Sequence, residues 1–214
     1  REAFGDRPGF VLGDIGPFGG VMAPYGDIDP EEVRLAFAEQ ARALVSGGAD
    51  AILVETQTSL EELGLGIDAA RDAGAPCIIA SLAFDVSPDG VFFRTMMGVA
   101  PEQAAVFAKE HGAHVVGLNC GTGIDMVRAR EIVGLYRSAC DLGTMVQPNA
   151  GMPVLENLKA VYRQTPEQMM EGVAELLEAG AGIVGGCCGS TPEHIQALRG
   201  AVDRFERMGK AGPQ

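Results

Sequence analysis

The sequence predicts an α/β protein of the TIM type, a (β/α)8 barrel that is here incomplete, with about six βα units. The first observation is a series of short apolar runs, typical of strands that are buried on both faces of a parallel sheet. The second is that a helical stretch follows each run, as in repeated βα units. The third is that polar residues and cysteines stand at the carboxyl ends of the runs, where barrel enzymes build their sites.

The predicted strands cover residues 10–15, 51–55, 77–82, 115–120, 145–148 and 183–187. The helices between them begin at Ser, Thr or Asp caps, or at a proline followed by an acidic residue. These starts lie at Asp29, Ser59, Pro101, Asp125, Thr165 and Thr191. A doubly wound nucleotide-binding sheet is the alternative, but residues 13–17 lack the Gly-x-Gly-x-x-Gly pattern that it needs. No linker divides the chain, so residues 1–214 are expected to form a single domain.

Composition narrows the class of partner and the compartment. A formal net charge of −13 over 214 residues argues against nucleic acid and against an anionic membrane as partner. No apolar run reaches the ~20 residues of a membrane span, and no signal peptide precedes the first strand. Five cysteines, two of them adjacent, are unlike a secreted disulfide framework and favour a cytoplasmic location. Because the sequence begins at Arg1 rather than Met, we expect the natural amino terminus to lie elsewhere.

Three of the cysteines are candidate metal ligands. Cys187 and Cys188 end the last predicted strand among glycines, which allow two adjacent thiols to leave strand geometry and face one site. Cys120 ends another strand, and the carboxyl ends of parallel strands converge. Three thiolates suit Zn²⁺ and leave one tetrahedral position open, as in catalytic zinc sites. The alternatives are three buried cysteines, a redox-active vicinal pair, or an iron–sulfur cluster, which usually takes four cysteines. Cys77 and Cys140 are expected to be core residues.

The motifs around these cysteines resemble the homocysteine S-methyltransferase family, which includes the homocysteine-binding barrel of cobalamin-dependent methionine synthase. The likeness lies in residues 117–120, Gly-Leu-Asn-Cys, and in residues 185–194, Gly-Gly-Cys-Cys-Gly-Ser-Thr-Pro-Glu-His. Further matching segments, in the family's order, are residues 13–17, 55–56, 147–151 and 161–162. The resemblance therefore covers nearly the whole chain.

The resemblance implies a zinc-dependent enzyme that methylates the thiol of homocysteine to give methionine. Cys120, Cys187 and Cys188 would hold the zinc, and the sulfur of homocysteine would take the fourth position. Three thiolates leave the site electron-rich, so that the bound sulfur stays nucleophilic.

The other site residues are predicted at strand ends around the same mouth. By resemblance, Glu55 would bind the amino group of homocysteine. Asp14, Asn119 and Asn149 are expected to line the substrate site or to orient the ligands. His194 is expected to be a surface residue of the last helix.

The chain departs from the family at its beginning. The family opens with a strand ending in Asp-Gly-Gly/Ala-Met-Gly-Thr and a second βα unit, and neither is present here. Six strands cannot close the usual barrel and would leave two unpaired edges. Three explanations stay open: the sequence is a fragment, the missing units lie on a separate chain, or the chain self-associates across its edges.

The methyl donor and two rival functions also stay open. The chain has no Asp-x-His-x-x-Gly segment for cobalamin, so a methyl-corrinoid would come on another protein. This donor is favoured over S-methylmethionine. One rival function is a non-catalytic zinc-binding partner subunit that completes a barrel with another chain. The other is a redox protein that uses the pair Cys187 and Cys188.

Overall fold

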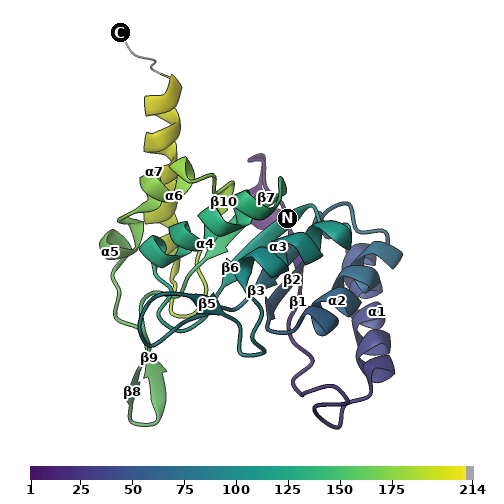
Figure 1. Cartoon of the computed structure of the whole chain (residues 1–214). Coiled ribbons are helices and arrows are strands. Elements are labelled where there is room, and N and C mark those ends of the chain that lie inside the picture. Colours follow the sequence, from purple (N-terminus) through teal and green to yellow (C-terminus); the bar gives the residue numbers. More distant parts are fainter. Residues whose placement is uncertain (211–214) are drawn as a thin grey trace.

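The fold is built on one parallel sheet whose strands follow the order of the chain. The structure is a computed structural model, which describes residues 1–210. The sheet order is β1-β2-β3-β6-β7-β10 (Figure 1). These strands span Leu12–Ile15, Ala51–Gln57, Ile78–Leu82, Val115–Asn119, Gly143–Gln147 and Ile183–Val184. A doubly wound sheet would reverse its order at a switch point, so the unbroken order indicates an incomplete TIM-type barrel, as predicted.

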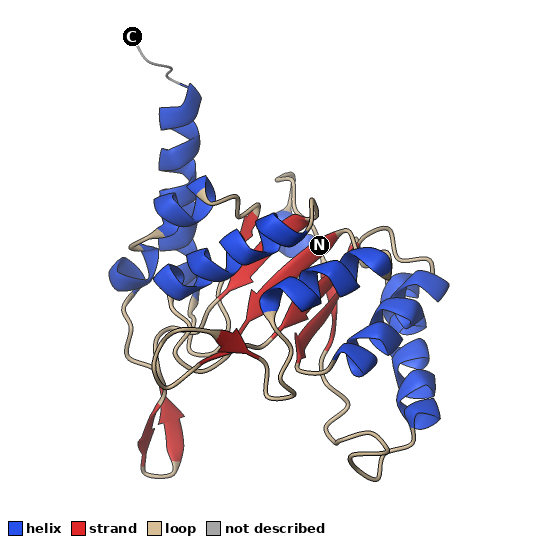
Figure 2. Ribbon diagram, in the orientation of Figure 1, coloured by secondary structure: helices blue, strands red, loops and turns tan. Residues whose placement is uncertain are grey.

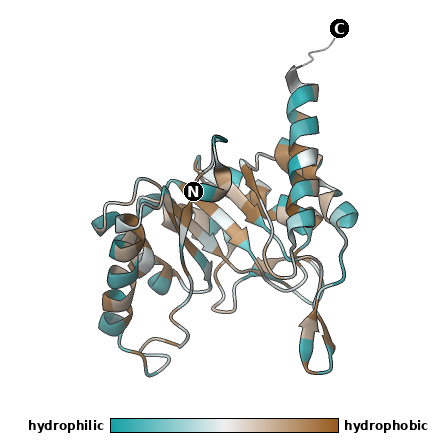
Figure 3. Ribbon diagram, turned by 180° about the vertical axis from the view of Figure 1, so that it is seen from behind, coloured by the Kyte–Doolittle hydropathy of each residue, from teal (hydrophilic) through white to brown (hydrophobic). Residues whose placement is uncertain are grey.

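The helices cover one face of this sheet (Figure 2). They are α1 (Pro30–Ser46), α2 (Leu60–Asp72), α3 (Pro101–Glu110), α4 (Met126–Ala139), α5 (Pro166–Met170), α6 (Val173–Glu178) and α7 (Pro192–Lys210). A 3-10 turn at Glu2–Phe4 lies on the other side of the sheet (Figure 3). The side chains of Asp29, Ser59, Asp125 and Thr165 cap α1, α2, α4 and α5, as predicted. The stretch after Thr165 is two short helices, because Gly172 between them has a left-handed backbone (φ 82°).

Both faces of the sheet carry apolar side chains. Along β2, Ile52 and Val54 pack against the helices in the main core. Leu53 points to the opposite face and forms a smaller cluster with Ile79 and Met145. Figure 3 shows the sheet from this second side, where brown apolar residues line the strands. Burial on both faces explains why these strands appear in the sequence as continuous apolar runs.

The two outer strands of the sheet each lack one neighbour. Within residues 1–210, β1 pairs with β2 alone, and β10 pairs with β7 alone. The sheet is therefore an open half-barrel, as the unit count predicts. Within the same residues, no helix has the combined length and apolar character needed to cross a membrane.

Two hairpins were not predicted, and both follow the carboxyl ends of sheet strands. The first joins β4 (Asp85–Val86) to β5 (Phe93–Arg94), and the second joins β8 (Val154–Glu156) to β9 (Lys159–Val161). Figure 1 shows the β8–β9 hairpin projecting from the body of the molecule. Its turn places Asn157 and Leu158 at positive φ (49° and 62°), the conformation of a tight hairpin turn. The second turn position is usually glycine, but here it is Leu158, so the sequence lacks the Asn-Gly signal that marks such a turn.

Candidate metal and substrate site

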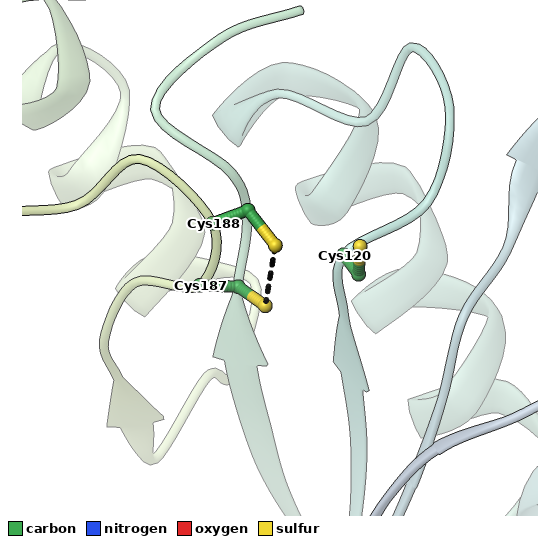
Figure 4. A group of neighbouring side chains, drawn as sticks. All are labelled: Cys120, Cys187 and Cys188. Atoms are coloured by element: carbon green, nitrogen blue, oxygen red, sulfur yellow. Dashed lines mark hydrogen bonds between the residues drawn. The ribbon is translucent and has the colours of Figure 1, made fainter. Parts of the chain in front are cut away.

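The three predicted cysteines meet at the carboxyl ends of the strands. Cys120 directly follows β6, whereas Cys187 and Cys188 follow β10, and β7 lies between these two strands. The three Sγ atoms lie within 4.8 Å of one another (Figure 4). Within residues 1–210 this is the one group of three or more His, Cys, Asp or Glu residues able to hold a metal ion. Cys77 and Cys140 are outside it, as expected.

The backbone around the cysteines explains why they converge. Cys120 has a left-handed backbone (φ 57°), which turns the chain sharply at the end of β6. Gly121 follows at φ 80°, and a Cβ there would lie 1.9 Å from the carbonyl oxygen of Phe84, so only glycine fits. On the other side, the strand ends at Val184, and Gly185 begins the loop that carries both adjacent thiols.

Backbone hydrogen bonds fix this loop against the neighbouring loop after β7. The Cys187 N–H donates to the Pro148 carbonyl at 2.9 Å, and the Ala150 N–H donates to the Cys188 carbonyl at 2.9 Å. The adjacent thiols therefore do not alternate as they would in a strand. Both sulfurs face Cys120, and their Sγ atoms are 3.9 Å apart (Figure 4).

The donor set fits zinc. Two sulfurs on one tetrahedral zinc ion are about 3.8 Å apart, given a Zn–S bond of about 2.3 Å. The separation of the Cys187 and Cys188 sulfurs is close to this value. The pKa of the Cys187 thiol is raised to about 11, chiefly by burial and also by the neighbouring sulfurs, against an opposing hydrogen bond from Asn119. A cation among the sulfurs would reverse this shift, because a coordinated thiol loses its proton.

Two asparagine side chains support the thiols. The Asn119 amide donates from Nδ2 to Cys187 Sγ at 3.8 Å, and the Asn149 amide donates to Cys120 Sγ at 3.7 Å. The carbonyl oxygen of Asn149 accepts the N–H of Cys188 at 3.1 Å. The two asparagines therefore contact all three cysteines, through side chain or backbone.

Asp14 and Glu55 form a second polar group at the ends of β1 and β2. Burial raises the pKa of Glu55, and the charge of Asp14 and the hydrogen bond that protonated Glu55 donates to it raise this pKa further. Burial also raises the pKa of Asp14, while the hydrogen bond with Glu55 opposes the shift. Two carboxyls in contact titrate as a pair, with one proton held between them to higher pH than either group alone would hold it.

We expect Asp14→Asn to stabilise the protein at pH 8 but not at pH 4. Carboxyls with raised pKa favour the folded state at low pH, and this stabilisation is lost as the pH rises through the raised values. At pH 8, Asp14→Asn removes one of the two carboxyls and so relieves the repulsion between Asp14 and Glu55. Because Asp14 is only partly shielded and keeps much of its surface in solvent, the gain in Tm should be only about 1–2 °C. Thermal denaturation at both pH values measures it, with Asp27→Asn as a control in an exposed loop. An equal gain at both pH values would contradict the shared proton.

The structure corrects the prediction for His194 and adds Tyr162. His194 is not a surface residue: it is 6% exposed, and its Nε2 lies 2.8 Å from the Gln164 carbonyl oxygen. The loop before α5 covers the first turn of α7, which position in the helix alone does not reveal. The same loop carries Tyr162, whose hydroxyl pKa is raised by burial and by the neighbouring Cys188. Its ring also packs so closely on Gly189 that a Cβ there would lie 2.3 Å away.

Comparison with known proteins agrees with the resemblance in the motifs. A family model described as homocysteine S-methyltransferase matches residues 1–202. Methionine synthase from Mycobacterium tuberculosis is 34% identical over 209 residues, which are 94% of this chain and 17% of that protein. Methionine synthase from Mycobacterium leprae is 35% identical over 204 residues, with 93% and 16% covered. The chain thus spans about a sixth of the length of these relatives.

Solved structures agree in fold. The homocysteine methyltransferase MmuM from Escherichia coli, in its apo form, superposes with a TM-score of 0.69 at 21% identity, covering 90% of this chain and 63% of that one. Its metallated form superposes with a TM-score of 0.68 at 19% identity, covering 89% and 60%. At these identities the likeness concerns the barrel scaffold.

Proposed function

Because the chain belongs to the homocysteine S-methyltransferase family, we propose that it transfers a methyl group to the thiol of homocysteine and so forms methionine. The observation that carries this proposal is the group formed by Cys120, Cys187 and Cys188 at the mouth of the half-barrel. Three thiols leave the fourth position of a tetrahedral metal site open for water or substrate, and the thiol of homocysteine is a ligand of the same chemical kind as the three cysteines. The curated relatives named above are methionine synthases, which supports the same reaction.

The metal proposed for this site is Zn²⁺, held by Cys120, Cys187 and Cys188. When bound, it would supply the deprotonation of the substrate thiol at neutral pH, which a free thiol with a pKa near 8.5 lacks. The three protein thiolates keep negative charge beside the substrate sulfur, whereas neutral histidines would not. In the transfer, a sulfur–methyl bond forms and the donor–methyl bond breaks, with its electron pair left on the donor. Asn119 and Asn149 orient the protein thiolates through the hydrogen bonds described above.

Glu55 and Asp14 are proposed to bind the α-ammonium group of homocysteine. They stand at the ends of β1 and β2, on the rim where β6 and β10 present the thiols. A pair that shares one proton carries a net charge of −1, which matches the single positive charge of the ammonium group. Burial of the pair makes it unfavourable to ionise the second carboxyl, and a bound cation would offset this unfavourable free energy.

The methyl donor is proposed to be a methyl-corrinoid carried outside this chain, with S-methylmethionine as the second candidate. The relatives are about six times longer than the chain, which leaves ample length in them for a donor-carrying domain. The open edges of β1 and β10 are proposed to pair with further strands, supplied by another segment, by a second chain or by another copy of this chain. The cytoplasm is the proposed compartment, because the cysteines are free thiols.

The proposal is tested by elemental analysis and by assay of the purified chain. We expect about one zinc ion per chain, and methionine formation from homocysteine with methylcobalamin or with S-methylmethionine. Zinc without methyl transfer from either donor, in protein shown to be folded by circular dichroism, would favour a non-catalytic zinc-binding subunit. Loss of two titratable thiols on mild oxidation, without any bound metal, would favour the redox function instead.

A further inference from the structure

The side chain of Asn119 is buried, and all of its hydrogen-bond donor and acceptor positions are occupied. It is 1% exposed. Its Oδ1 accepts the Thr56 N–H at 2.9 Å and the Ser81 hydroxyl at 2.7 Å. Its Nδ2 donates to Thr56 Oγ1 at 2.7 Å and to Cys187 Sγ at 3.8 Å. An amide offers two acceptor and two donor positions, so none is left over for a substrate.

These four bonds connect parts of the fold that the sheet itself keeps apart. Asn119 ends β6, Thr56 lies in β2 and Ser81 lies in β3, the strand between them. Cys187 belongs to the loop after β10, on the far side of β7. One side chain thus bridges from the second strand of the sheet to the loop after the sixth.

Thr56 is the unusual partner, because its backbone is left-handed (φ 59°). A β-branched residue is disfavoured there and keeps such a conformation only when its surroundings impose it. The register between β2 and β3 shifts between Val54 and Gln57, so the distortion is a bulge around Glu55 and Thr56. Bulges of this kind re-aim side chains next to active sites. Asn119 bonds both the N–H and the hydroxyl of Thr56, and so holds this bulge.

We propose that Asn119 is a positioning residue that fixes the bulge at Glu55 and Thr56 relative to Cys187. It sets the spacing between the carboxylate that receives the substrate ammonium and the thiol that holds the metal. This meaning of the spacing rests on the proposed function, whereas the physical coupling does not. Asn119 therefore acts through its neighbours and does not touch homocysteine.

Three variants separate the two arms of the coupling, which are the bonds from Asn119 to Thr56 and the bond from Asn119 to Cys187. Asn119→Ala removes both arms. Asn119→Asp keeps an acceptor for the Thr56 N–H and for Ser81, and the Thr56 hydroxyl can donate to the second oxygen of the new carboxylate. The arm to Thr56 is therefore kept, whereas the carboxylate places a negative charge next to Cys187 in place of a donor. Ser81→Ala removes one bond to Oδ1 and leaves the bonds to Thr56 and Cys187, so it is the matched control.

Two measurements on the full chain read the arms separately. Metal affinity, from chelator competition with Zn²⁺ and from the thiolate-to-metal absorption of the Co²⁺ form, reports on Cys187. Amide hydrogen exchange of residues 55–57 reports on the bulge. We expect Asn119→Ala to lower metal affinity about 10- to 100-fold, as loss of a supporting hydrogen bond does at metal sites, and to speed exchange at 55–57. Asn119→Asp should lower metal affinity alone, and Ser81→Ala should change both little.

The proposal is overturned if Asn119→Ala alters one readout and leaves the other at the wild-type value, or if Ser81→Ala matches it in both. Should Asn119→Ala fail to fold, Asn119→Asp decides: unchanged metal affinity in that variant excludes an arm to Cys187, and faster exchange at 55–57 excludes the separation of the two arms. If the wild-type chain binds Co²⁺ but homocysteine does not perturb its spectrum, the proposed function fails, while the two readouts still decide the role of Asn119.

Discussion

Cys120→Ser is expected to lose the bound metal and, with it, methyl transfer. Cys120 lies 67 residues before Cys187 in the sequence, yet its sulfur is within 4.8 Å of both other sulfurs. A serine hydroxyl is a hard ligand that stays protonated at neutral pH and does not replace a soft thiolate on zinc. Zinc sites with four ligands bind by about 10–16 kcal/mol, so loss of one ligand should weaken binding roughly 100- to 1000-fold.

Zinc content after dialysis against a weak chelator measures this effect, with the methyl-transfer assay beside it. Cys77→Ser is the matched control, because Cys77 packs against the small apolar cluster on the face of the sheet opposite the helices and lies outside the group of three. It should keep one zinc ion per chain. Equal zinc content in wild type and Cys120→Ser would show that the vicinal pair binds metal without Cys120, and the proposed site would be wrong.

The fold was largely predictable because its signals are local. Each sheet strand is an apolar run, and caps such as Ser59 and Asp125 mark helix starts by bonding backbone groups one turn away. The meeting of Cys120 with Cys187 was also predictable, since parallel strands place their carboxyl ends at one edge of the sheet. In each case, the residues that decide the structure are close in sequence or follow from topology.

The features that escaped prediction depend on long-range contacts. Nothing near Thr56 marks it as left-handed, because the cause is Asn119, 63 residues away. His194 is buried because the loop at Gln164 covers it, 30 residues earlier in the chain. Tyr162 belongs to a matching motif, but its contact with Cys188 arises only when the loops after β7 and β10 pack together. Supporting residues of this kind have no sequence signal of their own.

Glu55→Gln should weaken the binding of homocysteine and leave the metal in place. The substitution keeps the size of the side chain but replaces one of the two carboxyls that face the substrate ammonium group with a neutral amide. Truncating one partner of a hydrogen-bonded charge pair typically costs 2 kcal/mol or more, so the KM for homocysteine should rise roughly 30-fold. Asp14 remains as a second carboxylate, which limits the loss. Zinc content should stay at the wild-type value, because neither carboxyl belongs to the group of three cysteines.

A thiol without the amino group separates this effect from a general loss of activity. 4-Mercaptobutyrate has the carbon chain, carboxylate and thiol of homocysteine but no ammonium group for Glu55 to bind. Wild type should therefore prefer homocysteine over 4-mercaptobutyrate in kcat/KM, and Glu55→Gln should lose most of that preference while its activity toward 4-mercaptobutyrate stays unchanged. An equal loss of kcat/KM with both thiols would mean that Glu55 supports the fold of the site rather than the substrate. Adding Asp14→Asn to Glu55→Gln should abolish the remaining preference, because the ammonium group would then find no carboxylate at the ends of β1 and β2.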